Sequence, residues 1–279
     1  MPISVFHSGD LTVVTPPGRI LTQVGEDIAA GFAGTLAEKF VLYVGAHVLS
    51  PMEFEGRSVG VQTEQFFDET GEKLWNRLSV RRVGHMLSSF DHVLDLSPSN
   101  APLYASASDE LRAKLIFGPY IFPDHQPEFV PGAGNPIFFG TPTGRRKERL
   151  RELSRVSTIE RVRRGTFGEE LAALVRPASA VVNLHIGEGI YTEYPRMLSA
   201  YLSGKAVLSE PLAAPLEKGK HYADIETPFD PADAETHFRN FAEFAREFSI
   251  SRLFEHPVIR AAAVPPGDGK TGGTAGSGD

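Results

Sequence analysis

Short apolar runs alternate along the chain with segments whose apolar residues recur every three or four positions. In the first half, FVLYVGAH at residues 40–47 is typical of a buried strand. Ahead of it, Ile28, Phe32 and Leu36 follow a four-residue step, which predicts a helix over residues 25–39. A strand is also predicted at residues 3–7, a short apolar run that ends in polar residues at 58–65, and a strand followed by a polar turn within 92–100. A helix is predicted through Leu74, Trp75 and Leu78, whereas the apolar run at residues 113–123 is broken by glycine and proline before a helix can form.

The second half repeats this alternation with clearer helix signals. Thr166 and Glu169 have the spacing of a capping box at the start of a helix. The run SAVVNLHI at residues 179–186 predicts a strand. The apolar residues Tyr194, Met197, Leu198, Tyr201 and Leu202, at i, i+3, i+4, i+7 and i+8, predict a helix after it. Gly204 stands where such a helix usually ends. Further strands are predicted at residues 135–143, 157–162 and 205–210, and a basic helix at residues 145–153.

Strands that alternate with helices in both halves predict parallel sheets joined by right-handed crossovers. The Pro- and Gly-rich segment at residues 124–136 is typical of a linker. We therefore expect an α/β protein of two Rossmann-like, doubly wound domains, residues 1–130 and 131–262, with a cleft between them. The Gly-rich composition of residues 263–279 predicts a disordered tail. Its GDGKT does not predict a phosphate-binding loop, because that motif needs a preceding strand and a glycine at position 264, where the chain has valine.

Composition narrows the class of protein. The 279 residues are 41% hydrophobic and 23% charged, enough for one large core or two modest ones. The net charge of −7 argues against a nucleic-acid partner, and the lack of cysteine excludes disulfides, thiolate zinc sites and a cysteine nucleophile. The apolar runs are too short for a transmembrane segment and MPISVFHSGD does not resemble a signal peptide, so we expect a cytoplasmic protein. The oligomeric state is left open.

Polar residues at the carboxyl ends of the predicted strands are the first candidates for a ligand site, because ligands of open parallel sheets bind there. In the first half these include His47, Glu64 and Asp95, each a candidate general base by position. In the second half Asn183 and His185 end a strand, and the free N–H groups of the following helix favour an anion.

Two adjacent arginines supply the charge that a bound phosphate needs. A helix N-terminus contributes only about 0.3–1 kcal/mol, so tight binding of a diphosphate requires cationic side chains as well. Arg145 and Arg146 follow the predicted strand at residues 135–143 and suit this purpose, whereas Lys205 and Lys218 are less well placed.

Structural interpretations of the same residues stay open. Glu193 and Arg196 are three positions apart on a predicted helix, where a surface ion pair is as reasonable as a ligand contact. His185 is also compatible with a half-buried structural histidine, and Asn183 with a residue that caps the following turn. The basic run at residues 145–153 is compatible with a solvated helix face.

The segments VVNLH and EYPRMLSAYLSGKAVLSE resemble the carboxyl-terminal domain of glycosyltransferases with the GT-B fold. They are most similar to bacterial glycosyltransferase-like proteins (group 1 type) that carry Asn-Leu-His, then Glu-x-x-Arg, then Gly-Lys-x-Val-x-Ser-Glu. The resemblance extends upstream through VGAHVL, VQTEQ, VLDLSPSN, the GPY turn and FFGTPTGRR, and covers most of residues 40–215.

This resemblance implies a nucleoside-diphosphate sugar held mainly by the second domain and an acceptor that enters from the first. It implies that the arginines and the helix N-terminus stabilise the leaving diphosphate, and that neither a metal nor a cofactor is needed beyond the donor substrate. The residues it places at the donor are Thr141, Arg145 and Arg146 near the diphosphate, Asn183, His185 and Glu188 facing the donor, and Tyr191, Thr192, Glu193 and Arg196 at the helix start.

The leading hypothesis is a glycosyltransferase of the hexosyltransferase type that transfers a sugar to an unknown acceptor, such as a polysaccharide or glycoprotein precursor. Its first catalytic candidates are His185 and Glu193, and its secondary candidates are His47 and Glu64. The sequence does not determine the donor, the acceptor or whether the reaction inverts or retains configuration.

A second hypothesis is a noncatalytic glycosyltransferase-like module that binds a partner or glycan in the same cleft. Many retaining members carry Glu-x7-Glu, whose second glutamate binds the ribose, but the corresponding positions here are Tyr191 and Ser199. A dehydrogenase is disfavoured because no Gly-x-Gly-x-x-Gly follows a predicted strand.

Overall fold

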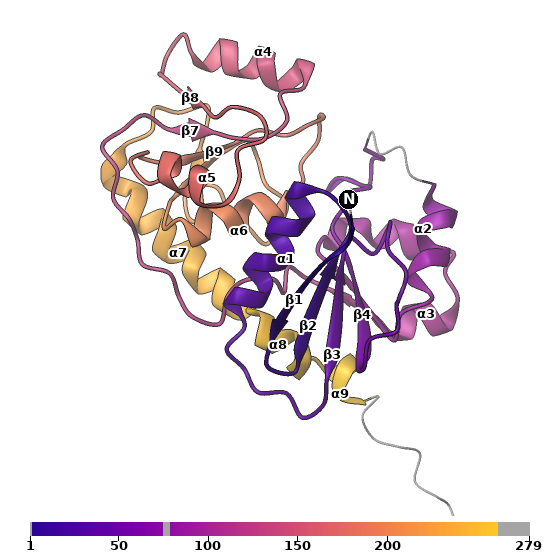
Figure 1. The fold of residues 1–279 in the computed structure, drawn as a ribbon. Coiled ribbons are helices and arrows are strands. Elements are labelled where there is room, and N and C mark those ends of the chain that lie inside the picture. The colour runs from indigo at the N-terminus through magenta and orange to yellow at the C-terminus, as the bar shows by residue number, and fades with distance from the viewer. Residues whose placement is uncertain (1, 75–78, 262–279) are drawn as a thin grey trace, which may run out of the picture.

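The computed structural model describes residues 2–74 and 79–261, which form two sheets flanked by helices (Figure 1). Trp75 and Leu78 of one predicted helix, and the predicted tail at residues 263–279, lie outside the described residues. Nearly all neighbouring strands are parallel, and helices pack on both faces of each sheet, so the protein is of the mixed α/β class.

The first sheet has six strands whose order across the sheet is their order along the chain. They are β1 (Ser4–Ser8), β2 (Leu11–Thr15), β3 (Phe40–Val44), β4 (Arg57–Gln62), β5 (His92–Asp95) and β6 (Leu115–Phe117). The β1–β2 pair is antiparallel and turns at Gly9, whose φ of 58° costs a glycine little; β2 was not predicted from the sequence.

The sequential strand order corrects the prediction that the first half is doubly wound, because a doubly wound sheet reverses its strand order. Helix α1 (Arg19–Gly31) packs on one face, whereas α2 (Val80–Leu87), η1 (Pro98–Tyr104) and α3 (Asp109–Ala113) pack on the other. Since β2–α1–β3 and β4–α2–β5 advance in the same direction with their helices on opposite faces, these two crossovers differ in hand. The expectation of uniformly right-handed crossovers is therefore wrong for this sheet.

Two predicted helices begin elsewhere than expected. The helix predicted over residues 25–39 runs from Arg19 to Gly31 and stops because Phe32 is extended, with the N–H of Ala33 donating to Asp124 Oδ2 at 2.8 Å. The helix predicted from a capping box at Thr166 begins at Gly168, and the residue before it, Phe167, has no side chain that can accept a hydrogen bond.

The second sheet has five parallel strands in the order β11-β10-β9-β7-β8. They are β7 (Ile137–Phe138), β8 (Glu160–Arg161), β9 (Val181–Asn183), β10 (Val207–Ser209) and β11 (Ala223–Asp224). The chain first moves from β7 to β8 and then returns past β7 to β9, so the strand order reverses between β7 and β9. This reversal is the topological switch point of a doubly wound sheet, and the prediction is confirmed for this half.

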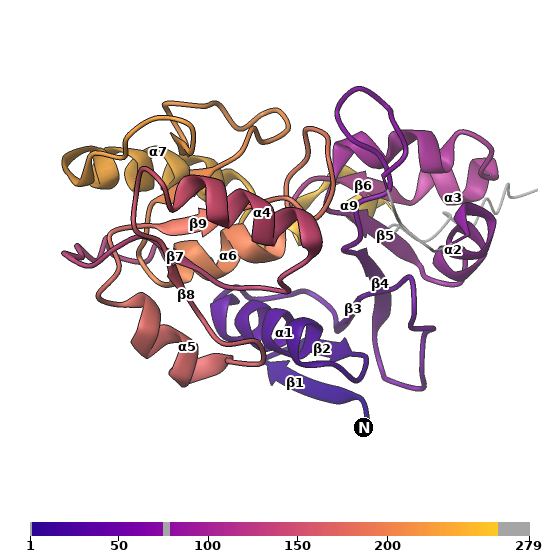
Figure 2. The same cartoon turned by 90° about the horizontal axis from the view of Figure 1, so that it is seen from above.

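Helices cover both faces of the second sheet in the manner that the reversal requires. Helix α4 (Gly144–Leu153) packs on one face, and α5 (Gly168–Val175), α6 (Tyr194–Leu202) and α7 (Ala234–Glu247) pack on the other. Figure 2 shows α1 on the side of the first sheet that faces α5 and α6. One buried apolar cluster accordingly contains residues of both halves, including Ile28 of α1 and Met197 of α6.

The chain returns to the first half at its end. After η2 (Pro231–Asp233) and α7, helices α8 (Ile250–Glu255) and α9 (Pro257–Ala261) pack against the first sheet. There the ring centroids of Phe254 and Phe40 lie 4.8 Å apart. The predicted division at residue 131 assigns these helices to the second half, although they contact the first. Within the described part of the chain, no helix has the length and apolar character to span a membrane.

Candidate functional site

A cavity of about 490 Å³ lies between the two halves and is lined by segments that follow the carboxyl ends of strands. The first half contributes the start of α1, which follows β2, and residues 63–65, which follow β4. The second half contributes residues 139–141 after β7, residues 163–167 after β8 and residues 191–193 after β9. The carboxyl edges of both sheets therefore meet at one cavity, and the switch point between β7 and β9 opens into it.

The lining of this cavity carries more positive than negative charge. Five arginines and two glutamates line it: Arg19, Arg146, Arg163, Arg164, Arg196, Glu64 and Glu193. Apolar side chains such as Phe139, Phe167 and Leu171 form much of the remaining wall. A concave site with an apolar wall and convergent cations suits a ligand that has both an anionic group and an apolar surface.

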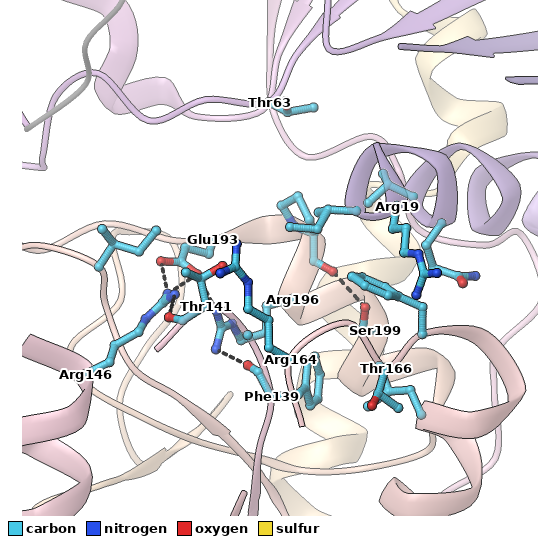
Figure 3. Close-up of a pocket in the computed structure, with 18 of the residues that line it drawn as sticks. Arg19, Thr63, Phe139, Thr141, Arg146, Arg164, Thr166, Glu193, Arg196 and Ser199 are labelled. Atoms are coloured by element: carbon cyan, nitrogen blue, oxygen red, sulfur yellow. Dashed lines mark hydrogen bonds and ion pairs between the residues drawn. The ribbon is translucent and has the colours of Figure 1, made fainter. Parts of the chain in front are cut away.

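Glu193 lies between two arginines, which together form what we call the inner cluster: Arg146, Glu193 and Arg196. Arg146 Nη2 donates to both carboxylate oxygens of Glu193 at 2.7 and 2.8 Å, and Arg196 Nη2 donates to one of them at 2.9 Å (Figure 3). Burial acts to raise the pKa of Glu193, but the charges of Arg196 and Arg146 outweigh it and hold the pKa below its usual range. Glu193 is therefore an anion at neutral pH.

Backbone carbonyls fix the two arginines of the inner cluster. Arg146 is 1% exposed and also donates from Nε to Leu184 O at 2.8 Å and from Nη1 to Thr141 O at 3.2 Å. Arg196 Nη1 donates to Phe139 O at 2.9 Å. A Cβ added at Gly140, whose φ is 131°, would lie 2.9 Å from Arg196 Nη2, so this position needs glycine. Most donor atoms of these two arginines therefore have partners, although the buried Nε of Arg196 has none among the described residues.

Arg145, the neighbour of Arg146, points to another group of carboxylates. Its Nη1 and Nη2 atoms bind both oxygens of Glu210 at 2.9 and 2.8 Å, and its Nε donates to Glu188 at 2.8 Å. Glu188 itself is 88% exposed. Among the described residues, Arg145, Glu188 and Glu210 are not part of the cavity lining. The structure thus separates the two adjacent arginines that the sequence pairs as diphosphate ligands.

His185 and Asn183 are buried behind the cavity and lie outside the described residues that line it. The His185 ring stacks on Tyr191 with centroids 4.2 Å apart, and its Nε2 lies 2.8 Å from Pro211 O, which fixes the proton on Nε2. Burial lowers the pKa of His185, so the ring is neutral. Asn183 Nδ2 donates to Ser209 Oγ at 2.9 Å. Both residues therefore contact other residues of the protein behind the cavity wall, such as Tyr191 and Ser209.

The remaining sequence candidates of the second half line the cavity. Tyr191 is held by the N–H of Gly187, which donates to its hydroxyl at 3.0 Å, and burial raises its pKa to about 12. Thr192 accepts from the N–H of Ala213 at 3.2 Å, and Thr141 is exposed at the end of the β7 loop. Of these three neutral side chains, Thr141 is the exposed one, whereas Tyr191 and Thr192 are buried with their hydroxyls bound to backbone N–H groups.

Glu64 enters the cavity from the first half and faces the inner cluster. Burial raises the pKa of Glu64, and the negative charge of Glu193 raises it further. His47 Nε2 lies 3.7 Å from Glu64 Oε1, but burial lowers the pKa of His47 to about 4, so the contact is between a neutral ring and a carboxyl group. A carboxyl group with a raised pKa at a ligand site is suited to accept a proton.

The third candidate base of the first half, Asp95, is fully buried and is not among the described residues that line the cavity. It accepts from Tyr104 Oη at 2.7 Å, from the N–H of Ser97 at 2.9 Å and from Asn100 Nδ2 at 3.0 Å. These groups hold the turn after β5. Lys205 is also buried, with Nζ donating to the carbonyls of Val130 and Arg176.

Three arginines of the cavity were not predicted from the sequence, and we call them the rim arginines: Arg19, Arg163 and Arg164. All three are exposed, and Arg19 Nη1 donates to Gly165 O at 2.7 Å across the two halves. Arg163 and Arg164 follow the carboxyl end of β8, and this position after a predicted strand is the sequence signal that could have identified them. Arg19 lacked such a signal because the strand before it was not predicted.

Comparison with known proteins adds no assignment. No family model matches the chain, and no curated protein matches it significantly. Within the described residues, no group of three or more histidine or acidic side chains has the geometry of a metal site. The cavity is therefore the feature of the molecule that points to a function.

Proposed function

We propose that this protein is a glycosyltransferase with a GT-B-like arrangement that transfers a sugar from a nucleoside-diphosphate sugar, bound in the cavity between the two sheets, to a hydroxyl of a glycan or other acceptor. The observation that carries this proposal is the cavity itself, where the switch point of the second sheet faces the carboxyl edge of the first across an excess of arginines. The resemblance of residues 40–215 to such enzymes agrees with it. A cytoplasmic location is part of the proposal.

In this proposal the reaction needs one proton acceptor and one stabiliser of negative charge. A bond forms between the acceptor oxygen and the anomeric carbon while the bond from that carbon to the diphosphate oxygen breaks. Glu64 takes the acceptor proton, because its raised pKa and its place on the first-half wall suit a general base. The arginines of the cavity stabilise the departing diphosphate, and the hydroxyls of Thr141 and Tyr191 bind polar groups of the donor.

The test has a binding step and a turnover step. A matching sugar nucleotide at 100 times its dissociation constant stabilises the fold by about 2.7 kcal/mol, which thermal unfolding with UDP, GDP and dTDP sugars detects. Turnover is then measured as the rate at which the nucleoside diphosphate is released. We expect Glu64→Gln to bind the donor and lose most of the turnover, while Glu72→Gln, an exposed glutamate outside the cavity lining, behaves as wild type. No stabilisation by any sugar nucleotide contradicts the proposal.

A second candidate function is a noncatalytic module that binds a glycan or partner in the same cavity. Two observations favour it: Arg145 and Arg146 already bind carboxylates, and His185 is buried behind the wall. Intact ligand binding with turnover absent in the wild type, under conditions that include a range of acceptors, supports this module over the enzyme.

A further inference from the structure

The five arginines of the cavity fall into two groups that differ in what compensates their charge. In the inner cluster, Glu193 and several backbone carbonyls take up the donors of Arg146 and Arg196. A phosphate at that place would have to displace the Glu193 carboxylate from two guanidinium groups. The inner cluster is therefore a poor place for an added anion, although the sequence directs attention to it.

The rim arginines are not compensated in this way. Within residues 2–74 and 79–261, the described carboxylates that form ion pairs do so with other cations, and none pairs with Arg19, Arg163 or Arg164. The excess positive charge of the cavity is concentrated at its rim as a result. An anion that enters the cavity gains most from this charge.

The positions of the rim arginines suit one anion that touches both halves. Figure 3 shows Arg19 entering from helix α1 and Arg164 entering from the second half, on the side of Phe139. The bond from Arg19 Nη1 to Gly165 O, 2.7 Å long, brings Arg19 beside the loop that carries Arg163 and Arg164. The first turn of the 13-residue helix α1 follows Gly18, so its free N–H groups also favour an anion here.

We propose that the rim arginines form a phosphate-binding subsite of the cavity, distinct from the inner cluster, and that the ligand is a phosphate or diphosphate ester with an apolar portion. Guanidinium groups bind phosphate oxygens in pairs of hydrogen bonds, and three of them match a doubly charged group. Ile20, which is 56% exposed, and Phe167 lie beside the rim arginines on the cavity wall and provide surface for the apolar portion. This inference rests on the proposed function only in that both place the ligand in the same cavity.

Isothermal titration of the full chain with pyrophosphate, with nucleoside diphosphates and with an alkyl phosphate tests the subsite. Pyrophosphate reports on the shared chemistry, while the other two ligands distinguish a nucleotide from a lipid-linked phosphate as its source. We expect binding by the wild type and weakening of about tenfold or more in R163Q/R164Q, with a smaller salt dependence. R19Q weakens binding as well, which tests the contribution of the first half.

The double variant R155Q/R161Q is the matched control, because it removes the same charge from exposed arginines of the same region outside the cavity lining. Equal weakening in this control, unchanged binding in R163Q/R164Q, or no binding of any of the three ligands by the wild type overturns the subsite. Phosphate binding that depends on Arg163 and Arg164, without any sugar transfer, supports the subsite and contradicts the glycosyltransferase. If R163Q/R164Q transfers sugar with full activity and unchanged donor affinity, the result supports the glycosyltransferase and contradicts the subsite.

Discussion

The carboxyl edges of the two sheets both contain buried carboxylates, but their partners differ. At the first sheet, Asp95 accepts hydrogen bonds from neutral donors, and burial raises its pKa to about 7. At the second sheet, Glu193 and Glu210 are bound by arginines that hold their pKa values below the usual range against the effect of burial. The first edge keeps its turn with neutral hydrogen bonds, whereas the second concentrates charge beside the switch point. Only the second is organised around permanent charge.

The sharpest way to break this comparison is to remove a buried cation from the second edge. Arg146→Met leaves the Glu193 carboxylate with Arg196 alone and deprives two backbone carbonyls of a donor. We expect a loss of about 3 kcal/mol in the free energy of unfolding, measured with urea. Arg151→Met, on the exposed face of the same helix, should change it by less than about 0.5 kcal/mol. Equal losses in the two variants would falsify the idea that burial of the pair matters.

A second change tests how tightly the inner cluster is packed. Gly140→Ala places a Cβ 2.9 Å from Arg196 Nη2 at a φ of 131° that L residues rarely adopt. We expect a destabilisation of about 2 kcal/mol by chemical denaturation. Gly144→Ala, where an added Cβ has no heavy atom within 4 Å, should be neutral or slightly stabilising. A neutral Gly140→Ala would show that Arg196 moves aside at no cost.

The two edges should also respond oppositely to pH. The folded state keeps the Asp95 proton up to about pH 7 although the ordinary pKa is 3.8, so it binds more protons than the unfolded chain between these values. Stability from this group is therefore present at low pH and lost as pH rises through about 7. Against Asp95→Asn, the wild type should lose about 1 kcal/mol between pH 5.5 and 6.5. Unfolding curves recorded at several pH values check this, and a constant difference between the two proteins would contradict it.

Glu193 and Glu210 give the opposite sign, because their folded pKa values are lowered. Their contribution is present above the unfolded pKa of glutamate and lost as pH falls through the lowered folded values. Acidification below the ordinary pKa of glutamate should thus lower the stability that Glu193 and Glu210 give the second edge. At that pH Asp95 is protonated and no longer opposes folding at the first edge.

The smallest expected effect concerns the exposed end of the charged network. Glu188 pairs with Arg145 but is 88% exposed, so solvent screens the interaction. Glu188→Gln should lower the free energy of unfolding by less than about 0.5 kcal/mol, measured with urea at low and high salt. A loss well above 1 kcal/mol would indicate that Glu188 is part of the buried network after all.

Local sequence was sufficient for much of the architecture and for part of the site. The predicted strands at residues 40–47 and 179–186 contain β3 and β9, and the helix predicted from the apolar positions between Tyr194 and Leu202 is α6. The principle that ligands bind at strand ends also led to Glu64 and Glu193, both of which line the cavity. It did not distinguish these two residues from His185, which follows β9 as Glu193 does but is buried behind the cavity wall.

The residues that sequence reasoning missed depend on contacts between distant parts of the chain. Arg19 reaches Gly165 across 146 positions, and Arg145 binds Glu210 across 65. Neither separation leaves a periodic pattern, because a side chain's choice of partner is made through space. Adjacent residues such as Arg145 and Arg146 even face different surroundings, since successive positions on a helix point about 100° apart.

The sequence by itself determined many of the strands and helices and several of the polar residues at strand ends, because burial of one face imposes a period on the local sequence. Tertiary structure alone decided the order of the strands, which reverses in the second sheet and not in the first. It also decided which charges are neutralised inside the protein and which remain at the cavity rim. Strand order and charge pairing depend on how distant segments pack in space, and a periodic pattern in the local sequence does not predict that packing.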